Sequence, residues 1–304
     1  MNATLIQMTA LMLCGAGWSV FCPNRLTADQ TRLVLTSVVY YFLLPAMVLD
    51  VLWKADIGWQ SLKFSALGCS SIVLAILVSW LIAGLCRFKR AQTGAMILAA
   101  AFPNTTYLGL PVLEQAYGSW SRSVVIQMDL FATAPLVFTV GVMLARHYGA
   151  ADDGKSKSLL GFLNAPPFWA AFAAVALNLG HITPPNWLDG LLVMLAAAVA
   201  PLMIFSLGLA LSWRAIRLHN LPYIVPIVLI KLMLFPWAGM HIADYLQLQN
   251  PFRAAAVLDI AMPSMVLGVV LCDRYQLDSS LYATAVTVTT GLSLLTLPFW
   301  FGVL

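Results

Sequence analysis

The sequence predicts an all-α integral membrane protein in which ten transmembrane helices form two inverted five-helix repeats. Three observations lead to this prediction: an apolar composition, ten long apolar runs, and five runs on each side of the longest polar connection. Only 9% of the 304 residues are charged and 61% are hydrophobic, whereas an ordinary soluble domain has about 25% charged residues. A soluble globule needs a larger polar surface, so a soluble enzyme or binding module is disfavoured.

The apolar runs define the predicted transmembrane helices, since each crossing of a bilayer needs about 20 apolar residues. The first five runs cover about residues 4–22, 33–53, 62–86, 94–117 and 123–145, and the second five about 159–180, 188–212, 221–246, 254–272 and 280–302. No Lys or Arg precedes the first run, so it is expected to be a helix and not a signal peptide. The connections are short, which makes residues 1–304 a single integral membrane unit.

Basic residues predict how the chain is oriented in the cytoplasmic (inner or plasma) membrane. One set of alternating loops holds eleven of them, Arg25, Arg32, Arg87, Lys89, Arg90, Arg146, Lys155, Lys157, Arg214, Arg217 and Arg274. The other set holds four, Lys54, Lys63, Arg122 and Arg253. Cytoplasmic loops carry the excess of Lys and Arg. The first set is therefore expected in the cytoplasm, and both termini on the non-cytoplasmic side.

The repeat is predicted from the odd number of helices in each half, which forces the halves into opposite orientations. The longest connection, 146–158, separates a first repeat at residues 1–150 from a second at 155–304. Proline spacings agree between the halves. The first set of prolines is spaced by 58 and 32 residues and the second by 62 and 35, at Pro45, Pro103 and Pro135, then Pro201, Pro263 and Pro298.

The fourth run contains the strongest candidate for a binding site. Pro103 is followed by Asn104, Thr105 and Thr106, and a second proline, Pro111, follows in the same run. Proline breaks a helix, and small polar residues after it can cap a second half-helix whose free amides suit an anion. The ninth run offers a counterpart in Pro263 and Ser264. Matched interruptions favour a transporter site; the alternative is a pair of proline-kinked packing helices.

Ionisable residues inside the runs are candidates for ion coupling, because charges within a bilayer are costly unless they are paired or hydrated. They are Asp129, Asp259 and Lys231. A carboxyl group among apolar side chains binds a proton more readily than one in water. The alternatives are interhelical hydrogen bonds or ion pairs for these residues. For Asp50, near the end of its run, interfacial pairing with Lys54 is favoured.

Other function classes find little support. Gly149–Ser156 fits the phosphate-binding pattern G-x-x-x-x-G-K-S, but it lies in a short connection with no α/β domain around it, so nucleotide binding is not expected. The net charge of +4 is spread thinly, which argues against nucleic-acid binding. No catalytic or metal-binding constellation is present in the sequence, and no cofactor is expected beyond a coupling proton or sodium ion.

Several segments together resemble the auxin efflux carrier family, which includes bacterial malonate- and malate-transporter-like proteins and the plant PIN carriers. The resemblance covers the whole chain, and its most specific part is the fourth run. The segments are Leu43–Ala46, Phe102–Pro111, Ile230–Leu232 with Pro236, Ala261–Ser264 and Leu292–Pro298.

The resemblance implies a scaffold domain and a transport domain, with the fourth and ninth helices crossing at Pro103 and Pro263. It implies that an organic anion binds beside this crossover, with Asn104 meeting its carboxylate. Ser264 stands where plant members carry other polar residues. The long central loop of many plant carriers is absent, so a small carboxylate is expected instead of auxin. The resemblance leaves proton coupling, sodium coupling and uniport open.

The sequence thus favours a secondary carrier of small organic anions that is not an enzyme. The two alternatives are an intramembrane enzyme acting on a lipid-linked substrate and a passive anion channel. The expected partners are membrane lipid and a small organic anion, and a homodimer is left open.

Overall fold

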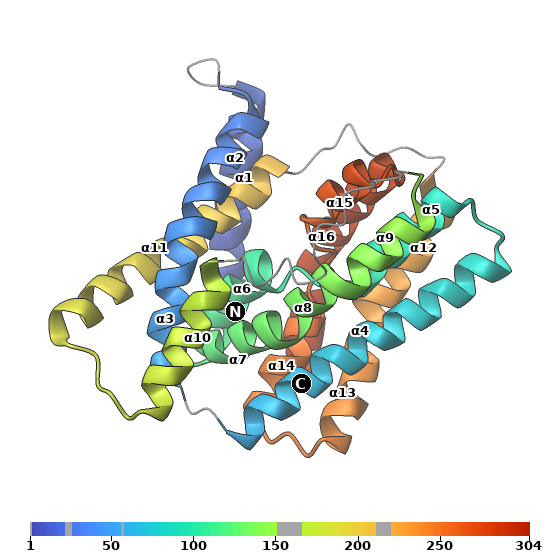
Figure 1. The fold of residues 1–304 in the computed structure, drawn as a ribbon. Helices are drawn as coiled ribbons and strands as arrows, with labels where there is room; N and C mark the ends of the chain where they lie inside the picture. Colours follow the sequence, from blue (N-terminus) through green and yellow to red (C-terminus); the bar gives the residue numbers. More distant parts are fainter. Residues whose placement is uncertain (1, 22–25, 56–57, 151–165, 211–219) are drawn as a thin grey trace.

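The computed structural model describes residues 2–21, 26–55, 58–150, 166–210 and 220–304. Several predicted features lie outside these ranges, among them Arg25, Arg214, Arg217 and most of the 146–158 connection with its Gly149–Ser156 motif. Within the described ranges every named element is a helix, and β pairing is confined to one isolated bridge. The described part of the chain is therefore all-helical (Figure 1).

Helical elements follow one another closely, and those labelled η are π-helical. In chain order they are α1 (Asn2–Phe21), α2 (Ala28–Val38), η2 (Val39–Leu43), α3 (Leu44–Trp53), α4 (Trp59–Leu85), α5 (Arg90–Ala101), η3 (Thr105–Gly109), α6 (Leu110–Tyr117), α7 (Ser121–Met128), η4 (Asp129–Thr133), α8 (Ala134–Leu136), η5 (Val137–Gly141), α9 (Val142–Tyr148), α10 (Pro166–Leu179), α11 (Asn186–Ala210), α12 (Leu221–Leu229), η9 (Ile230–Leu234), α13 (Phe235–Tyr245), α14 (Phe252–Ile260), α15 (Gly268–Arg274) and α16 (Ser279–Val303).

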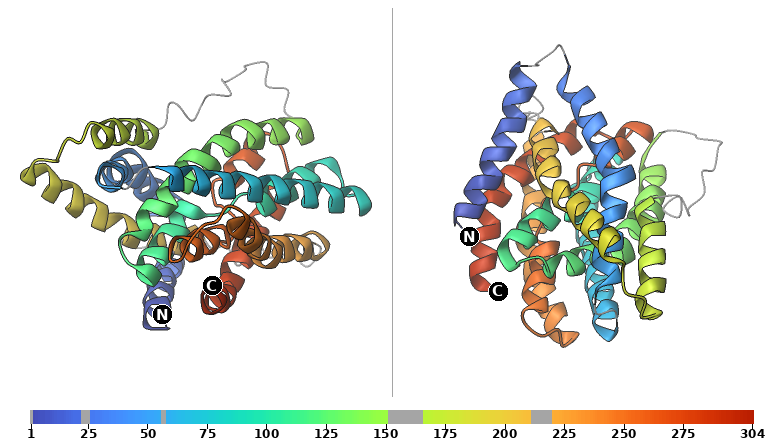
Figure 2. Two further views of the ribbon diagram at one scale, coloured as in Figure 1. Left: turned by 90° about the horizontal axis from the view of Figure 1, so that it is seen from below. Right: turned by 90° about the vertical axis from the view of Figure 1, so that its left-hand side faces the viewer.

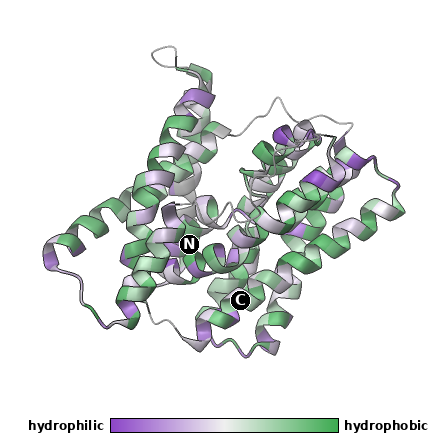
Figure 3. Cartoon of the chain, in the orientation of Figure 1, coloured by the Kyte–Doolittle hydropathy of each residue, from purple (hydrophilic) through white to green (hydrophobic). Residues whose placement is uncertain are grey.

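Each of the ten predicted apolar ranges contains helix among the described residues. Six helical stretches are long and apolar enough to cross a membrane, namely Ala28–Trp53, Trp59–Leu85, Ser121–Tyr148, Asn186–Leu209, Leu221–Tyr245 and Ser279–Val303. Thr9–Phe21 and Pro166–Leu179 are shorter apolar helices, and the ranges 94–117 and 254–272 hold interrupted helices. Figure 3 shows hydrophobic colour along the helices and hydrophilic colour near many of their ends. An all-helical membrane protein is confirmed, and the inverted repeat stays a prediction.

Proline explains most of the π-helical turns. Four of the five described π-helical segments end two residues before a proline, at Pro45, Pro111, Pro135 and Pro236. Proline lacks an N–H group and its ring clashes with the carbonyl four residues earlier, and a wider π-turn gives this ring room. The carbonyl of Leu232, which Pro236 leaves without its helical donor, accepts a hydrogen bond from Trp300 Nε1 at 2.8 Å. At this proline the freed backbone carbonyl is therefore paired within the protein, as lipid requires.

Two groups of helices make up the molecule (Figures 1 and 2). We call α1, α2–η2–α3, α10 and α11 the side bundle, because α11 packs on α1, α2 and α3, and α10 packs on α3. We call α4–α9 and α12–α16 the crossover bundle. In the side bundle α1 and α11 approach closely at Gly15 and Gly208: a Cβ on Gly15 would overlap the Phe205 carbonyl, and one on Gly208 the Met12 carbonyl. Small residues at such contacts are typical of membrane helices.

Polar contacts of the side bundle gather at one end of α3. Lys54 Nζ lies 2.6 Å from Asp50 Oδ1 and also pairs with Asp189 at the start of α11. Burial alone would lower the pKa of Lys54, but hydrogen bonds to Asp189 and Asp50 raise it on balance. Asn178 of α10 donates to the Trp53 and Ala55 carbonyls at 2.8 Å. The predicted pairing of Asp50 with Lys54 is confirmed, and these contacts fix α3 to both α10 and α11.

Candidate functional site at the crossover

The helices of the fourth and ninth predicted runs are both interrupted, and the two interruptions lie side by side. Between α5 and η3 the chain is extended at Phe102 and Pro103, and Pro103 forms an antiparallel bridge with Ser264, between α14 and α15. The Asn104 amide donates to the Pro263 carbonyl at 2.8 Å, and the Met265 amide donates to the Phe102 carbonyl at 3.1 Å. Segments that are far apart in sequence thus satisfy each other's backbone groups in the middle of the crossover bundle.

Ser264 completes this backbone pairing. In a continuous helix the carbonyl of Ala99 would accept from the amide of residue 103, but Pro103 has no N–H. The hydroxyl of Ser264 donates to this carbonyl instead, at 2.7 Å. The Ser264 amide in turn donates to Thr289 Oγ1 at 3.2 Å. Ser264 is fully buried, and both of these groups are therefore engaged within the protein.

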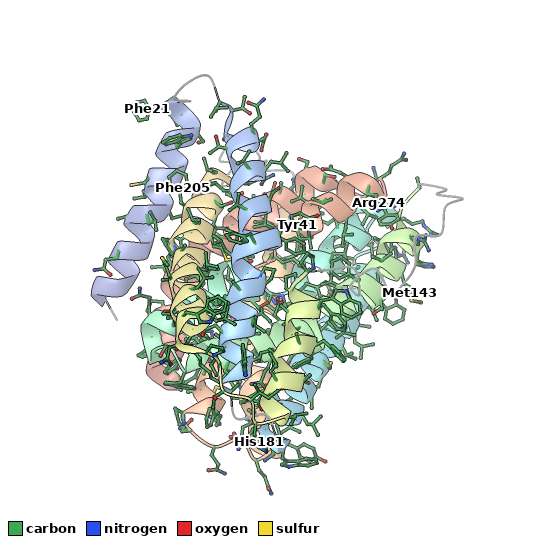
Figure 4. The ribbon with its side chains drawn as sticks, turned by 60° about the vertical axis from the view of Figure 1, so that its left-hand side comes forward. Phe21, Tyr41, Met143, His181, Phe205 and Arg274 are labelled. Atoms are coloured by element: carbon green, nitrogen blue, oxygen red, sulfur yellow. The ribbon has the colours of Figure 1, made fainter. Side chains whose placement is uncertain are left out.

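A cavity of about 400 Å³ lies where the side bundle meets the crossover bundle. The side bundle contributes residues of α2, η2, α3 and α10. The crossover bundle contributes the first interruption, η3, α6 to η5, and the apolar residues 265–267 of the second interruption. Tyr41, labelled in Figure 4, is one of the lining residues. The volume falls within the range of small-molecule sites. Its polar lining residues are Thr36, Ser37, Tyr40, Tyr41, Asn104, Thr105, Thr106, Tyr107, Asp129 and Thr133.

Asn104 combines burial with an unused donor. Its side chain is only 2% exposed and lines the cavity, and its Nδ2 has no hydrogen-bond partner among the described residues. η3 begins at Thr105, and the first amides that bond back to the Asn104 carbonyl are those of Leu108 and Gly109. The amides of residues 105–107 precede these bonds, as the first amides of a helix do. Free donors and the positive end of a helix therefore face the same space.

Asp129 lies on the same side of η3 and lines the cavity. Thr105 Oγ1 donates to Asp129 Oδ1 at 2.7 Å, and Thr106 Oγ1 donates to Asp129 Oδ2. These are the interhelical hydrogen bonds that the sequence left as an alternative for this residue. Among the described residues that line the cavity, Asp129 is the one with a charged side chain, and none is Lys, Arg or His.

Asp259 and Lys231 lie behind the first interruption and do not line the cavity. Both are fully buried, and neither the Asp259 oxygens nor Lys231 Nζ has a hydrogen-bond partner within the described ranges. The two side chains form no ion pair within 4.0 Å of each other. Lys231 Nζ lies 3.9 Å from the centre of the Phe235 ring. A Cβ on Gly109 would overlap Asp259 Oδ1, so a larger residue where η3 passes this carboxyl group would have to displace it.

The structure therefore divides the predicted site residues. Pro103, Asn104, Thr105, Thr106 and Asp129 line the cavity, whereas Pro263, Ser264, Asp259 and Lys231 lie in the packed interior beside it.

The polar face of α2 and η2 was missed by the sequence interpretation, which singled out Asp50, Pro45 and the Leu43–Ala46 segment in this run. A signal was present, because Thr36, Ser37, Tyr40 and Tyr41 recur with the period of one helix face.

Comparison with known proteins places the chain in a family. Residues 3–301 match the family described as membrane transport protein. An "Uncharacterized transporter" of Methanothermobacter thermautotrophicus is 27% identical over 99% of this chain and 97% of its own length. The "Uncharacterized transporter YfdV" of Escherichia coli K12 is 24% identical over 97% of this chain and 95% of its own length.

A third relative has a name that states a substrate. The "Putative malonate transporter" of Rhizobium meliloti is 26% identical over 86% of this chain and 83% of its own length. With an all-helical apolar architecture and a family match over nearly the whole sequence, the chain belongs to the membrane transport protein (auxin efflux carrier) family and is a membrane transporter, not an enzyme.

Proposed function

We propose that this transporter is a secondary carrier of small organic anions across the cytoplasmic membrane and that the anion binds at the first interruption. The observation that supports the proposal most strongly is the buried Asn104 amide, which lines the cavity without a partner. A buried donor without an acceptor is rare in native structures. A substrate carboxylate in the cavity supplies that acceptor and can also accept hydrogen bonds from the amides of residues 105–107. Thr105 and Thr106, whose hydroxyls donate to Asp129, border the bound anion.

We also propose that the crossover bundle moves against the side bundle during transport. The side bundle contains the first two predicted helices of each half, and the crossover bundle contains the last three of each half. This equal division supports two inverted five-helix repeats, at residues 1–150 and 155–304. Ion pairs and amide hydrogen bonds fix α3, α10 and α11 to one another, which suits a scaffold. The crossover of Pro103 and Pro263 then carries the anion site.

The coupling residues in this proposal are Asp129, Asp259 and Lys231. Asp129 borders the anion site, while Asp259 and Lys231 form a second, enclosed group behind η3. A movement that separates η3 from α14 would change the surroundings of both groups. Ser264 holds the crossover together and in the conformation described here makes its contacts to protein groups.

Uptake into proteoliposomes tests the proposal. Purified chain is reconstituted and offered labelled mono- and dicarboxylates, beginning with malonate because of the name of the Rhizobium meliloti relative. Proton and sodium gradients are imposed separately. We expect saturable uptake of at least one carboxylate that unlabelled substrate inhibits. Linear, non-saturating flux would favour the anion channel, and no uptake across the panel would contradict the proposal.

Thiol labelling tests the proposed orientation, in which both termini face outward. In a cysteine-free background, Ser156→Cys is expected to react only with a membrane-permeant reagent in intact cells. Ser119→Cys, in the connection between α6 and α7, is the matched control and is expected to react with an impermeant reagent. The opposite pattern would invert the topology.

A further inference from the structure

The charge of the cavity conflicts with an anionic substrate. Asp129 is the one acidic residue among the described residues that line the cavity, and no base lines it with Asp129. The carboxyl group is tied to the hydroxyls of Thr105 and Thr106, which are part of the segment where the anion is proposed to bind. An ionised Asp129 would therefore stand beside the substrate carboxylate. Two like charges this close repel each other, more strongly in a partly buried site than in bulk water.

The groups around Asp129 do not cancel this repulsion. Tyr40 of η2 and Tyr107 of η3 lie within reach of its charge, as does Asp259 of α14, which is itself acidic.

Basic groups on other neighbouring elements are already engaged in contacts of their own. Arg122 on α7 is paired with Glu114. The titratable side chains of α4, which packs on η4, are Lys63, whose ammonium group donates to the Gln247 carbonyl, and Cys69. The guanidinium group of Arg32, on α2, lies 3.7 Å from the Asp29 carboxylate.

We propose that Asp129 binds one proton together with each substrate anion, so that the carrier is a proton–anion symporter. This inference rests on the proposed function and names its coupled ion. The proton enters with the anion on one side, stays on the Asp129 carboxyl group during the movement, and leaves with the anion on the other side. In its protonated form the group is neutral and gains an O–H donor for the substrate carboxylate. A monocarboxylate then crosses without net charge, and a dicarboxylate dianion carries one net negative charge.

The geometry favours a proton over a sodium ion at this position. The hydroxyl of Thr105 is in direct hydrogen-bond contact with Asp129 Oδ1, at 2.7 Å, and that of Thr106 with Oδ2. A proton needs only one lone pair of a carboxyl oxygen, whereas a metal ion needs several oxygen ligands around one point. A proton fits without moving either oxygen.

The test compares the wild type, Asp129→Asn and the matched control Asp244→Asn in proteoliposomes. Asp244 pairs with Arg253 near the end of α13, away from the cavity. The probe is labelled malonate, or the carboxylate of the panel that the wild type transports. Malonate exchange is measured between pH 6 and pH 8 with equal pH on both sides. Net uptake is then driven by an inside-alkaline pH gradient or by an inward sodium gradient, with the membrane potential clamped.

We expect the apparent affinity of the wild type for malonate to weaken by up to about tenfold for each unit by which the pH rises. The reason is that one proton is bound with each anion, and protons become scarcer as the pH rises. The same profile is expected for Asp244→Asn. Asp129→Asn carries a permanently neutral side chain, so it should retain exchange, lose most of this pH dependence and lose accumulation driven by the pH gradient. Titration of malonate itself affects all three proteins equally, so the difference between the profiles reports Asp129.

Three results would overturn the inference. The first is that the pH profiles of the wild type and Asp129→Asn coincide, and the second is that wild-type accumulation is driven by the sodium gradient and not by the pH gradient. The third is that a folded Asp129→Asn has lost malonate exchange at every pH. If the variant does not fold, the wild-type response to the two gradients decides alone. Wild-type uptake that ignores the pH gradient removes only the proton coupling. Absence of any carboxylate uptake removes the proposed function and this inference with it.

Discussion

The two helix interruptions look alike in sequence but differ in how their polar groups are used. Each has a proline followed by a small polar residue, Asn104 in the first and Ser264 in the second. The Asn104 amide is unpaired within the described part of the chain and borders the cavity. The Ser264 hydroxyl is paired with the Ala99 carbonyl, and its amide is paired with Thr289. The first interruption therefore has an unpaired donor that a ligand can use. The polar groups of Ser264 in the second interruption are instead bonded within the protein.

This difference follows from the chemistry of proline. Pro103 leaves the Ala99 carbonyl without a helical donor, and a polar group from the opposite half must supply one. Because the Ser264 hydroxyl donates its hydrogen to the Ala99 carbonyl, it cannot donate to a ligand in the same conformation. The halves of the molecule therefore contribute unequally: the first interruption, η3 and η4 bring polar groups to the cavity, whereas the second interruption lines it only with the apolar residues 265–267. Variants at the two interruptions should accordingly change different measured quantities.

The largest effect is expected for Asn104→Ala, in substrate affinity. Loss of one hydrogen bond to a charged group costs about 1.5–3 kcal/mol, which weakens binding about 10- to 150-fold. Stability without substrate should hardly change, because the amide that is removed has no partner in the described structure. Binding isotherms and thermal unfolding on one preparation check both statements. If stability falls while affinity holds, Asn104 has a structural role like that of Ser264.

Gly109→Ala should disturb the contact between the two interruptions. The added methyl group would overlap Asp259 Oδ1 and crowd Met262 Cγ, 3.2 Å away. Overpacking of this kind costs about 1–3 kcal/mol of stability. Gly291→Ala in α16 is the matched control, because a Cβ there meets nothing within 4 Å. Thermal unfolding of Gly109→Ala, Asp259→Ala and the double variant should show that the second substitution relieves the first; additive losses would contradict the contact.

Ser264→Ala should lower stability more than it changes substrate affinity. It removes the donor of the buried Ala99 carbonyl, and an unsatisfied buried acceptor costs about 1–3 kcal/mol. The effect on affinity should be smaller than that of Asn104→Ala, as its hydroxyl does not line the cavity. An affinity loss equal to that of Asn104→Ala, at unchanged stability, would place the substrate at the second interruption as well.

The smallest effect is expected for Thr290→Val, the control for Ser264→Ala. Thr290 is also fully buried in the crossover bundle, but its Oγ1 has no hydrogen-bond partner among the described residues. Replacing an unpaired buried hydroxyl by a methyl group of similar size should be nearly neutral or slightly stabilising. A loss as large as that of Ser264→Ala, in the same unfolding assay, would show that burial and not the Ala99 hydrogen bond explains the Ser264 effect.

Hydropathy and proline predicted the fold well, because lipid-facing helices must be long, apolar and internally hydrogen-bonded. The interruption after Pro103 and the cavity-lining position of Asn104 could be anticipated for the same reason. The donor for the Ala99 carbonyl could not, since it comes from Ser264, far away in sequence. The role of Gly109 against Asp259 likewise depends on a contact between halves. Thr36, Ser37, Tyr40 and Tyr41 carried a helical period that could have revealed the second wall of the cavity.

A structure of the protein with a bound, transported carboxylate tests the central claim most directly. The account predicts a substrate carboxylate within about 2.7–3.2 Å of Asn104 Nδ2 and of at least one amide of residues 105–107. The hydroxyl of Ser264 should remain on the Ala99 carbonyl in that structure. A carboxylate bound to the Ser264 hydroxyl, or one bound away from η3 with the Asn104 amide still unpaired, would contradict the assignment of the first interruption as the anion site.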